Sequence, residues 1–192
     1  MFEITIPAIK KGFKTLLFTN NGFKSLFITG LLLLTLSGIP AQRETDYKIH
    51  ANIIYRFTKY IDWPVNKKAG DFIIGIVGDS PLFEDLKSVS ANKMVGEQKI
   101  VVVRMVPSAS FYNCQILFIS DEESGSLKRI ALVTAGAAIL IISESDGLAR
   151  KGSCINFVTV DERLKLEINK SNIEQRNLRI ASELLALGIL IK

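Results

Sequence analysis

Three continuous apolar runs, each followed by a turn or a helix-like stretch, limit this chain to very few folds. They are Asp71–Val77, Cys114–Ser120 and Ala137–Ser143. A run without polar alternation is typical of a strand buried on both faces, as in a parallel sheet between two layers of helices. We therefore expect a single α/β domain over residues 46–190, with helices on both faces of a mixed, mostly parallel sheet.

The remaining elements follow from apolar periodicity and from turn signals. Apolar residues at helical spacing predict helices over 46–62 and 122–134, and a long closing helix over 172–190. The turn 161–163 separates two further strands, 154–160 and 164–169. With one more strand over 99–106, the sheet is expected to contain about six strands.

The first 41 residues have the organisation of a secretory signal. Four lysines lead into the uncharged core Leu26–Leu36, and a small-residue site ends at Ala41. We expect cleavage after Ala41, with a retained N-terminal anchor as the alternative because the lead before the core is long. Removing residues 1–41 lowers the net charge from +5 to +2. No basic surface then remains that would indicate nucleic-acid binding.

Composition restricts the chemistry that the domain can perform. Hydrophobic residues make up 48% of the 192 positions, which excludes a disordered chain. The one histidine, His50, excludes multi-histidine metal sites, and its place on the apolar face of the first helix predicts a structural role. Cys114 and Cys154 form no CxxC or Cys/His cluster, so we expect no metal, redox centre or other cofactor.

The two cysteines are expected to be unpaired. If the strand 154–160 ran antiparallel to the strand 137–143, Cys114 and Cys154 would lie at opposite ends of the sheet. That separation exceeds the Cα–Cα distance of about 7 Å that a disulfide can bridge. A loop that crossed back would instead bring the two residues together.

Gly78-Asp79-Ser80 is the segment that most resembles a catalytic loop. It is similar to the start of the GDS hydrolases, in which the serine is the nucleophile. That chemistry needs a histidine base, and the only histidine lies upstream on the first helix. We interpret Ser80 as the N-cap of the next helix, with Pro81 as its first residue.

Two polar residues near the C-terminus have structural interpretations. In the strand 164–169, alternation places Glu167 on a solvated edge, opposite the apolar side chains. Asn169 is expected to cap the closing helix. Since no group of residues amounts to an active site, the chain is expected to bind or regulate rather than catalyse.

Several motifs in order together resemble the YfiR/HmsC-like family of small periplasmic regulatory proteins. The family-motif positions are Trp63, Pro64, Gly78, Cys114, Gly152 and Asn169, within the segments Tyr47–Pro64, Ile74–Asp79, Cys114–Ser120, Gly152–Phe157, Leu166–Asn169 and Leu178–Leu187.

The resemblance implies a periplasmic regulator that is not an enzyme. It would inhibit a membrane-bound diguanylate cyclase or sensor kinase by protein–protein contact, and so affect cyclic di-GMP and biofilm output. An outer-membrane lipoprotein is a further implied partner, and a homodimer is implied as well. Candidate contacts are Tyr55, Tyr60 and Trp63, because aromatic residues are enriched at interface hot spots. The alternatives are a small-molecule sensor or binding domain and a hydrolase that uses Ser80.

The cysteine pattern departs from that of some family members. Those members carry a cysteine in the first strand that pairs with the residue matching Cys114, and this chain has Gly75 there. Some also carry a second cystine before the fifth strand, where only Cys154 is present. The family's disulfides are therefore not expected here.

Overall fold

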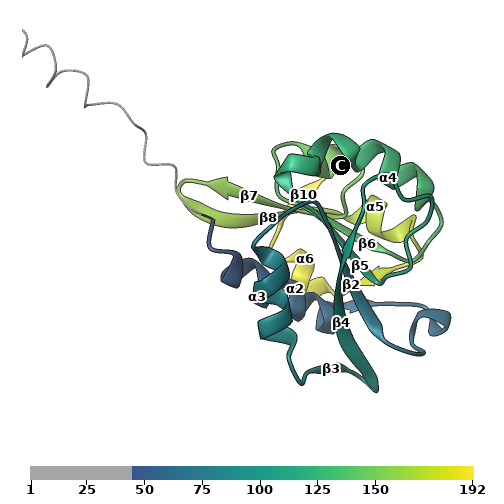
Figure 1. Ribbon diagram of the computed structural model, residues 1–192. Coiled ribbons are helices and arrows are strands. Elements are labelled where there is room, and N and C mark those ends of the chain that lie inside the picture. The colour runs from purple at the N-terminus through teal and green to yellow at the C-terminus, as the bar shows by residue number, and fades with distance from the viewer. Residues whose placement is uncertain (1–44) are drawn as a thin grey trace, which may run out of the picture. The chain divides into compact units, whose positions relative to one another are not determined.

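The three apolar runs of the sequence become adjacent strands at the centre of one eight-stranded sheet (Figure 1). The computed structural model describes residues 45–192, which form one compact unit. The predicted signal over residues 1–41 lies outside this part of the chain. Within residues 45–192, no helix is both long and apolar enough to cross a lipid bilayer.

The elements of the described residues are as follows. The strands are β1 (Ile61–Asp62), β2 (Phe72–Val77), β3 (Met94–Val95), β4 (Gln98–Met105), β5 (Ile116–Ile119), β6 (Leu140–Ser143), β7 (Ile155–Val160), β8 (Arg163–Asn169), β9 (Arg179–Ile180) and β10 (Ile189–Ile191). The α-helices are α2 (Tyr47–Tyr60), α3 (Leu82–Ser90), α4 (Leu127–Val133), α5 (Lys170–Glu174) and α6 (Ser182–Leu185), and the 3₁₀ helices are η1 (Val65–Lys67), η2 (Asp121–Ser126) and η3 (Leu148–Lys151).

The sheet is mostly parallel, and the direction in which successive strands are added reverses at β2. Its strand order is β10-β8-β7-β6-β5-β2-β4-β3, and all neighbouring pairs from β7 to β4 are parallel. The chain proceeds from β2 to β4 on one side and then returns to β5 on the other. Open α/β sheets place their ligand crevices at the carboxyl ends of the strands beside such a switch. In this sheet that place is the end of β2, after Val77.

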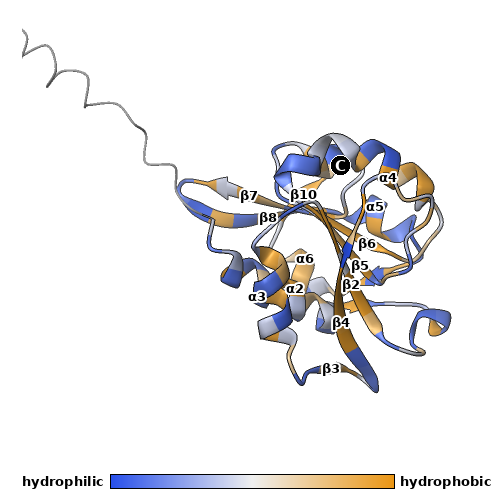
Figure 2. Ribbon diagram, in the orientation of Figure 1, coloured by the Kyte–Doolittle hydropathy of each residue, from blue (hydrophilic) through white to orange (hydrophobic). Residues whose placement is uncertain are grey.

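Helices cover both faces of the sheet, as the sequence predicts. Helices α2 and α3 pack together on one face, while α4 and α5 lie on the other (Figure 1). The central strands carry the apolar residues (Figure 2). Phe72, Phe118 and Phe157 are among the fully buried side chains of this core.

Local sequence determines where α2 begins and ends. The Asp46 carboxylate accepts hydrogen bonds from the backbone N–H groups of Lys48 and Ile49, at 3.1 and 3.3 Å. This N-cap begins the helix predicted over 46–62. The helix stops at Tyr60 because Ile61 and Asp62 pair with β9 in an antiparallel two-stranded sheet.

The hairpin predicted around the turn 161–163 is confirmed, and it joins β7 to β8. Asp161 and Glu162 adopt φ angles of 48° and 59° between β7 and β8. Two central residues with positive φ are typical of a two-residue hairpin turn whose twist matches that of the strands. β7 pairs with β6 only at Ile155 and Asn156, so the rest of the hairpin extends past β6.

The prediction of a long closing helix over 172–190 is wrong. The segment instead forms α5, β9, α6 and β10. Asn177 has a φ of 56°, a left-handed conformation that interrupts a helix. A Cβ atom on Gly188 would lie 2.4 Å from the Ile168 side chain, so this glycine allows β10 to lie against β8.

The prediction of about six strands is also too low. The main sheet has eight, because the short β3 extends it beyond β4 and β10 extends it beyond β8. The class itself, a mixed α/β domain with a mostly parallel sheet, is as predicted. The helix predicted over 122–134 is divided into η2 and α4.

Gly78 permits the sharp turn between β2 and α3. Its φ is +92°, and a Cβ atom at this position would approach the Ser120 hydroxyl oxygen to 2.1 Å. The backbone conformation and the neighbouring strand thus each exclude a side chain. The following helix begins at Leu82, one residue after the predicted Pro81, so its N-cap is Pro81 and not Ser80 as predicted. The Ser80 hydroxyl nevertheless accepts a hydrogen bond from the Leu82 N–H at 3.3 Å.

We expect Gly78→Ala to lower the free energy of unfolding by about 2–5 kcal/mol, the sum of left-handed backbone strain and overpacking. The matched control is Gly70→Ala, because Gly70 also has a positive φ, +71°, but has open space around its Cα. The control should lose only the strain, about 1–2 kcal/mol. Chemical denaturation measures both, and equal losses would contradict the steric role of Ser120.

Candidate functional site

The loop after α2 is held by two buried side chains, Trp63 and Gln115. The Trp63 indole packs edge-on against Phe72, with ring centroids 5.0 Å apart, and its Nε1–H donates to the Gln115 carbonyl oxygen at 3.2 Å. The Gln115 amide nitrogen donates to the Lys67 and Asp71 carbonyls, at 2.9 and 3.3 Å. The Pro64–Gly70 loop therefore has a fixed conformation on the edge of the core.

This loop and the segment before β9 border a surface hollow of about 570 Å³. Its polar walls include side chains of both charges, among them Asp62, Lys68, Glu174 and Arg179. Val65 stands at the rim with 85% of its surface exposed. We call this surface the Trp-Pro face: the residues that line the hollow, which are Asp62–Val65, Lys68, Glu174 and Asn177–Arg179.

The three aromatic residues predicted as contacts differ in their environment. Trp63 is buried, so it supports the Trp-Pro face from below and does not present its ring to a partner. Tyr55 and Tyr60 are half-buried and pack against the core. The Lys93 ammonium lies 4.1 Å from the centre of the Tyr55 ring. Pro64 is half-buried beside the exposed Val65.

A polar cluster occupies the carboxyl ends of the central strands, which the sheet topology marks as the place for a ligand. The Tyr47 hydroxyl donates to the Glu144 carboxylate at 3.2 Å, and the Asp121 N–H donates to the same oxygen at 3.2 Å. Ser80 is only 2% exposed, so its hydroxyl is not accessible to a substrate. The Ser120 hydroxyl is buried without a hydrogen-bond partner among the described residues.

Burial changes the acidity of two members of this cluster. It raises the pKa of Glu144, although the hydrogen bonds from Asp121 and Tyr47 act in the opposite direction. The pKa of Tyr47 is raised by burial and by the negative charge of Glu144. Sequence reasoning missed this cluster, yet a signal was present: Ser80, Ser120 and Glu144 each come within three residues of the end of an apolar strand.

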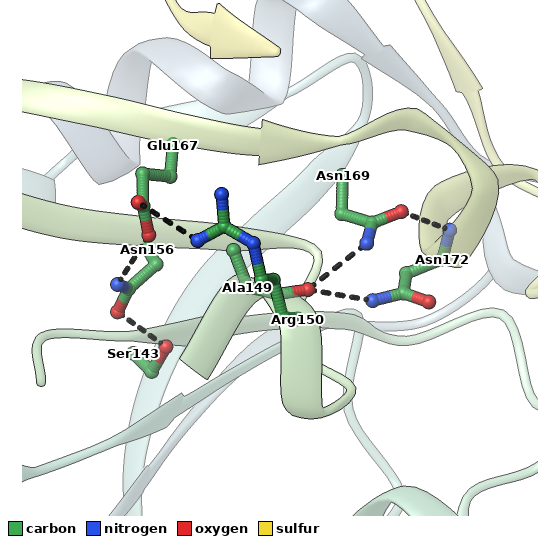
Figure 3. A network of polar contacts seen from close by, with 7 residues as sticks. All are labelled: Ser143, Ala149, Arg150, Asn156, Glu167, Asn169 and Asn172. Carbon is green, nitrogen blue, oxygen red and sulfur yellow. Dashed lines mark hydrogen bonds and ion pairs between the residues drawn. The ribbon is translucent and has the colours of Figure 1, made fainter. Parts of the chain in front are cut away.

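The Glu167 carboxylate is not on a solvated edge, which corrects the sequence prediction. Its side chain is 14% exposed, because β10 pairs with β8 where an open edge was expected. The Asn156 amide nitrogen donates to Glu167 at 3.0 Å, and the Ser143 hydroxyl donates to the Asn156 amide oxygen at 2.7 Å (Figure 3). The Arg150 guanidinium lies 4.0 Å from Glu167.

Asn169 and Asn172 hold the 3₁₀ turn η3 against the sheet (Figure 3). Asn169 is the N-cap of α5 as predicted, although for a shorter helix, and its Oδ1 accepts from the Asn172 N–H at 3.0 Å. Both amide nitrogens donate to the Ala149 carbonyl, at 2.9 and 3.2 Å. Gly152 ends the turn with a φ of +124°. Asn169 and Gly152, two of the family-motif positions, thus fix this turn in place together with Asn172.

Both cysteines are free and buried in this structure. The antiparallel pairing that would have placed them at opposite ends of the sheet is not present, because β7 runs parallel to β6. Cys154 lies beside Ile141, which pairs with Leu117, three residues beyond Cys114. Two strand spacings and three residues give a separation of about 14 Å, still too far for a disulfide.

The environment of each thiol suppresses its ionisation. Burial raises the pKa of Cys114 to about 12, and the Lys67 charge offsets only part of this effect. Burial raises the pKa of Cys154 to about 11 despite the neighbouring Arg176. At Gly75, where the family resemblance implied a missing cysteine, a Cβ atom would lie 2.5 Å from the Met105 sulfur. Met105 therefore fills the space of an absent side chain.

His50 is a buried residue of the core, in the place that its helical spacing predicts. Its ring centre lies 4.3 Å from that of Phe157, and its Nδ1 lies 3.1 Å from the Asp46 carbonyl oxygen. Burial lowers the pKa of His50, while Asp46 acts in the opposite direction. Among residues 45–192, no group of three or more His, Cys, Asp or Glu side chains could hold a metal ion.

Comparison with known proteins gives one family. The family described as YfiR/HmsC-like matches residues 47–189, which run from the start of α2 into β10. No curated protein matches the chain.

We expect both thiols to be unreactive in the folded protein. At pH 8 a thiol of pKa about 11 or 12 is almost entirely protonated, and both sulfurs are buried. Ellman's reagent should therefore react with neither cysteine in buffer and with both in denaturant. If neither cysteine reacted in denaturant, the two would be joined in a disulfide, and this result would contradict the structure.

We expect the stability of the domain to depend on pH through His50. Since the folded pKa of His50 lies below the ordinary 6.5, the unfolded chain binds a proton that the folded chain does not. The free energy of unfolding should therefore fall as the pH is lowered from 6.5 through the folded pKa. His50→Gln should flatten this dependence.

A proton NMR titration measures the pKa directly, because the chain has one histidine and hence one pair of imidazole signals. A value at or above 6.5 would contradict the buried environment of His50.

Proposed function

Because the chain belongs to the YfiR/HmsC-like family, we propose that it is an exported, periplasmic regulator that inhibits a membrane-bound signalling enzyme by direct contact. The family match over residues 47–189 is the observation that carries this proposal. The target is a diguanylate cyclase or a sensor kinase, and the affected output is cyclic di-GMP and biofilm formation. An outer-membrane lipoprotein is the partner that would relieve inhibition.

The proposed contact surface is the Trp-Pro face. Val65 projects from a loop that Trp63 and Gln115 hold in place, so binding costs little loss of loop freedom. The surrounding charges of both signs, such as Asp62 and Arg179, suit a polar rim around an apolar contact.

The environment of Ser80 argues against the hydrolase alternative. A nucleophilic hydroxyl must be reachable by substrate and bonded to a base. The Ser80 hydroxyl is buried and accepts a hydrogen bond from the Leu82 N–H. The only imidazole of the chain, on His50, instead faces Phe157 and the Asp46 carbonyl. Inhibition by contact needs no such pair.

We expect Val65→Asp to abolish inhibition without unfolding the domain. A charge in place of this exposed apolar side chain should weaken partner binding at least about tenfold. In the native host, cyclic di-GMP should then rise to the level of a strain that lacks the gene. Circular dichroism of the purified variant verifies the fold.

The matched control is Val106→Asp. Val106 is also an exposed valine, at 62%, but it follows the far end of β4, whereas Gln98 at the near end bonds the Lys67 carbonyl. Eight strand residues place the two sites about 26 Å apart along the sheet. Inhibition should persist in Val106→Asp, and equal effects of the two substitutions would contradict the proposed surface.

Ser80→Ala separates regulation from hydrolysis. It should cost about 1 kcal/mol of stability through loss of the bond to Leu82, and cyclic di-GMP should stay at the wild-type level. Loss of function with normal fold and abundance would favour the hydrolase instead.

A further inference from the structure

A basic cavity lies on the face of the sheet opposite α2 and α3, where the end of α4 meets α5 and the loop before β7. Its volume is about 310 Å³. Three of its ten lining residues are cationic, Lys128, Lys151 and Arg176, and none of the ten is acidic. The small side chains of Ala131 and Ala135 form part of its wall.

Arg176 is a buried cation without a carboxylate partner. The residue is 7% exposed, and its Nη1 donates to the carbonyl and the hydroxyl oxygen of Thr134, both at 3.0 Å. No carboxylate in residues 45–192 lies within ion-pair distance of its guanidinium. The carbonyls at the end of α4 supply only partial negative charge. Burying a charge without a full counter-charge is costly.

The two lysines increase this positive charge. Lys128 and Lys151 are exposed, and neither makes an ion pair or side-chain hydrogen bond with any residue that the structure describes. In contrast, Lys68 and Lys170 pair with Asp62 and Glu174. Both lysines beside the cavity thus keep their ammonium groups available for a ligand.

The backbone around the cavity is fixed in position. Gly152 has a φ of +124°, and a Cβ atom on it would lie 3.1 Å from the Ala131 Cβ, so the loop that carries Lys151 packs closely on α4. Asn172 fastens the same loop through hydrogen bonds to the Ala149 and Ser153 carbonyls, at 3.2 and 2.8 Å. The backbone that carries Lys151 and Arg176 is therefore in place before any ligand binds.

We propose that this cavity binds a small molecule that carries a carboxylate or phosphate group. The anion completes the charge balance of Arg176 and bonds Lys128 and Lys151, while the carbon part of the ligand lies against the alanine methyl groups. The volume is at the lower end of the range for small-molecule sites, about 300–1,000 Å³. The ligand is accordingly the size of a short dicarboxylate or a simple phosphate ester.

This site is separate from the Trp-Pro face and does not depend on the proposed inhibitory function. The two sites share no lining residue, although Glu174 of the Trp-Pro face directly precedes Gln175 and Arg176 of the cavity in the sequence. An effect on anion binding is measured on the purified domain alone. Its outcome therefore differs from that of the inhibition experiment.

The test titrates the domain with inorganic phosphate and, separately, with succinate at constant ionic strength, while amide NMR signals are recorded. We expect saturable shifts at Gly152 and Gln175 with at least one of the two probes. A response to phosphate alone assigns a phosphate ligand, and a response to succinate alone assigns a carboxylate. The double variant Lys128→Gln/Lys151→Gln should weaken binding at least tenfold.

The matched control is Lys48→Gln/Lys165→Gln, which removes the same charge from two exposed lysines outside the cavity. Its affinity should stay within twofold of the wild type. The absence of saturable shifts with both probes would overturn the proposal. An equal loss in the two double variants would also overturn it, because the effect would then come from net charge alone.

Discussion

The buried amide of Gln115 connects more of this fold than any other side chain described above. Its oxygen accepts from the Ile73 N–H of β2 at 2.9 Å, and its nitrogen donates to the Lys67 and Asp71 carbonyls. Its backbone carbonyl accepts from the Trp63 indole and from the Leu140 N–H that begins β6. One residue directly before β5 thus joins the segment after α2, the following loop and the strands β2 and β6. Because buried polar groups are costly when unpaired, this arrangement specifies a single position for the Trp-Pro face.

The residues that hold the loops in place are not the residues that are exposed to other molecules. Family-motif residues such as Trp63, Asn169 and Gly152 are buried or lie in tight turns, where they fix loops. At the carboxyl ends of the strands, where α/β folds usually bind ligands, the domain's own Tyr47 and Glu144 bond one another. Two of the surfaces open to other molecules are the Trp-Pro face and the basic cavity beside α4.

The sequence predicts the centre of the fold better than its borders. Continuous apolar runs identify β2, β5 and β6, because a strand that is buried on both faces needs apolar side chains at successive positions. The Asp161-Glu162 turn identifies the hairpin. The closing helix was predicted from 3-and-4 apolar spacing, and single backbone positions, Asn177 and Gly188, override that spacing. Glu167 was misplaced because alternation along β8 does not reveal that β10 covers its edge. Tyr47 and Glu144 are 97 residues apart, a contact that no local pattern encodes.

The central claim is that the domain regulates a membrane enzyme through the Trp-Pro face. The most direct measurement is site-specific photo-crosslinking in the native host, with the photoreactive residue at position 65 and, in a parallel strain, at position 106. The account predicts that position 65 captures a membrane-bound cyclase or kinase and that position 106, an exposed site directly after β4, does not. No membrane-enzyme adduct at position 65, or equal adducts at both positions, would contradict it.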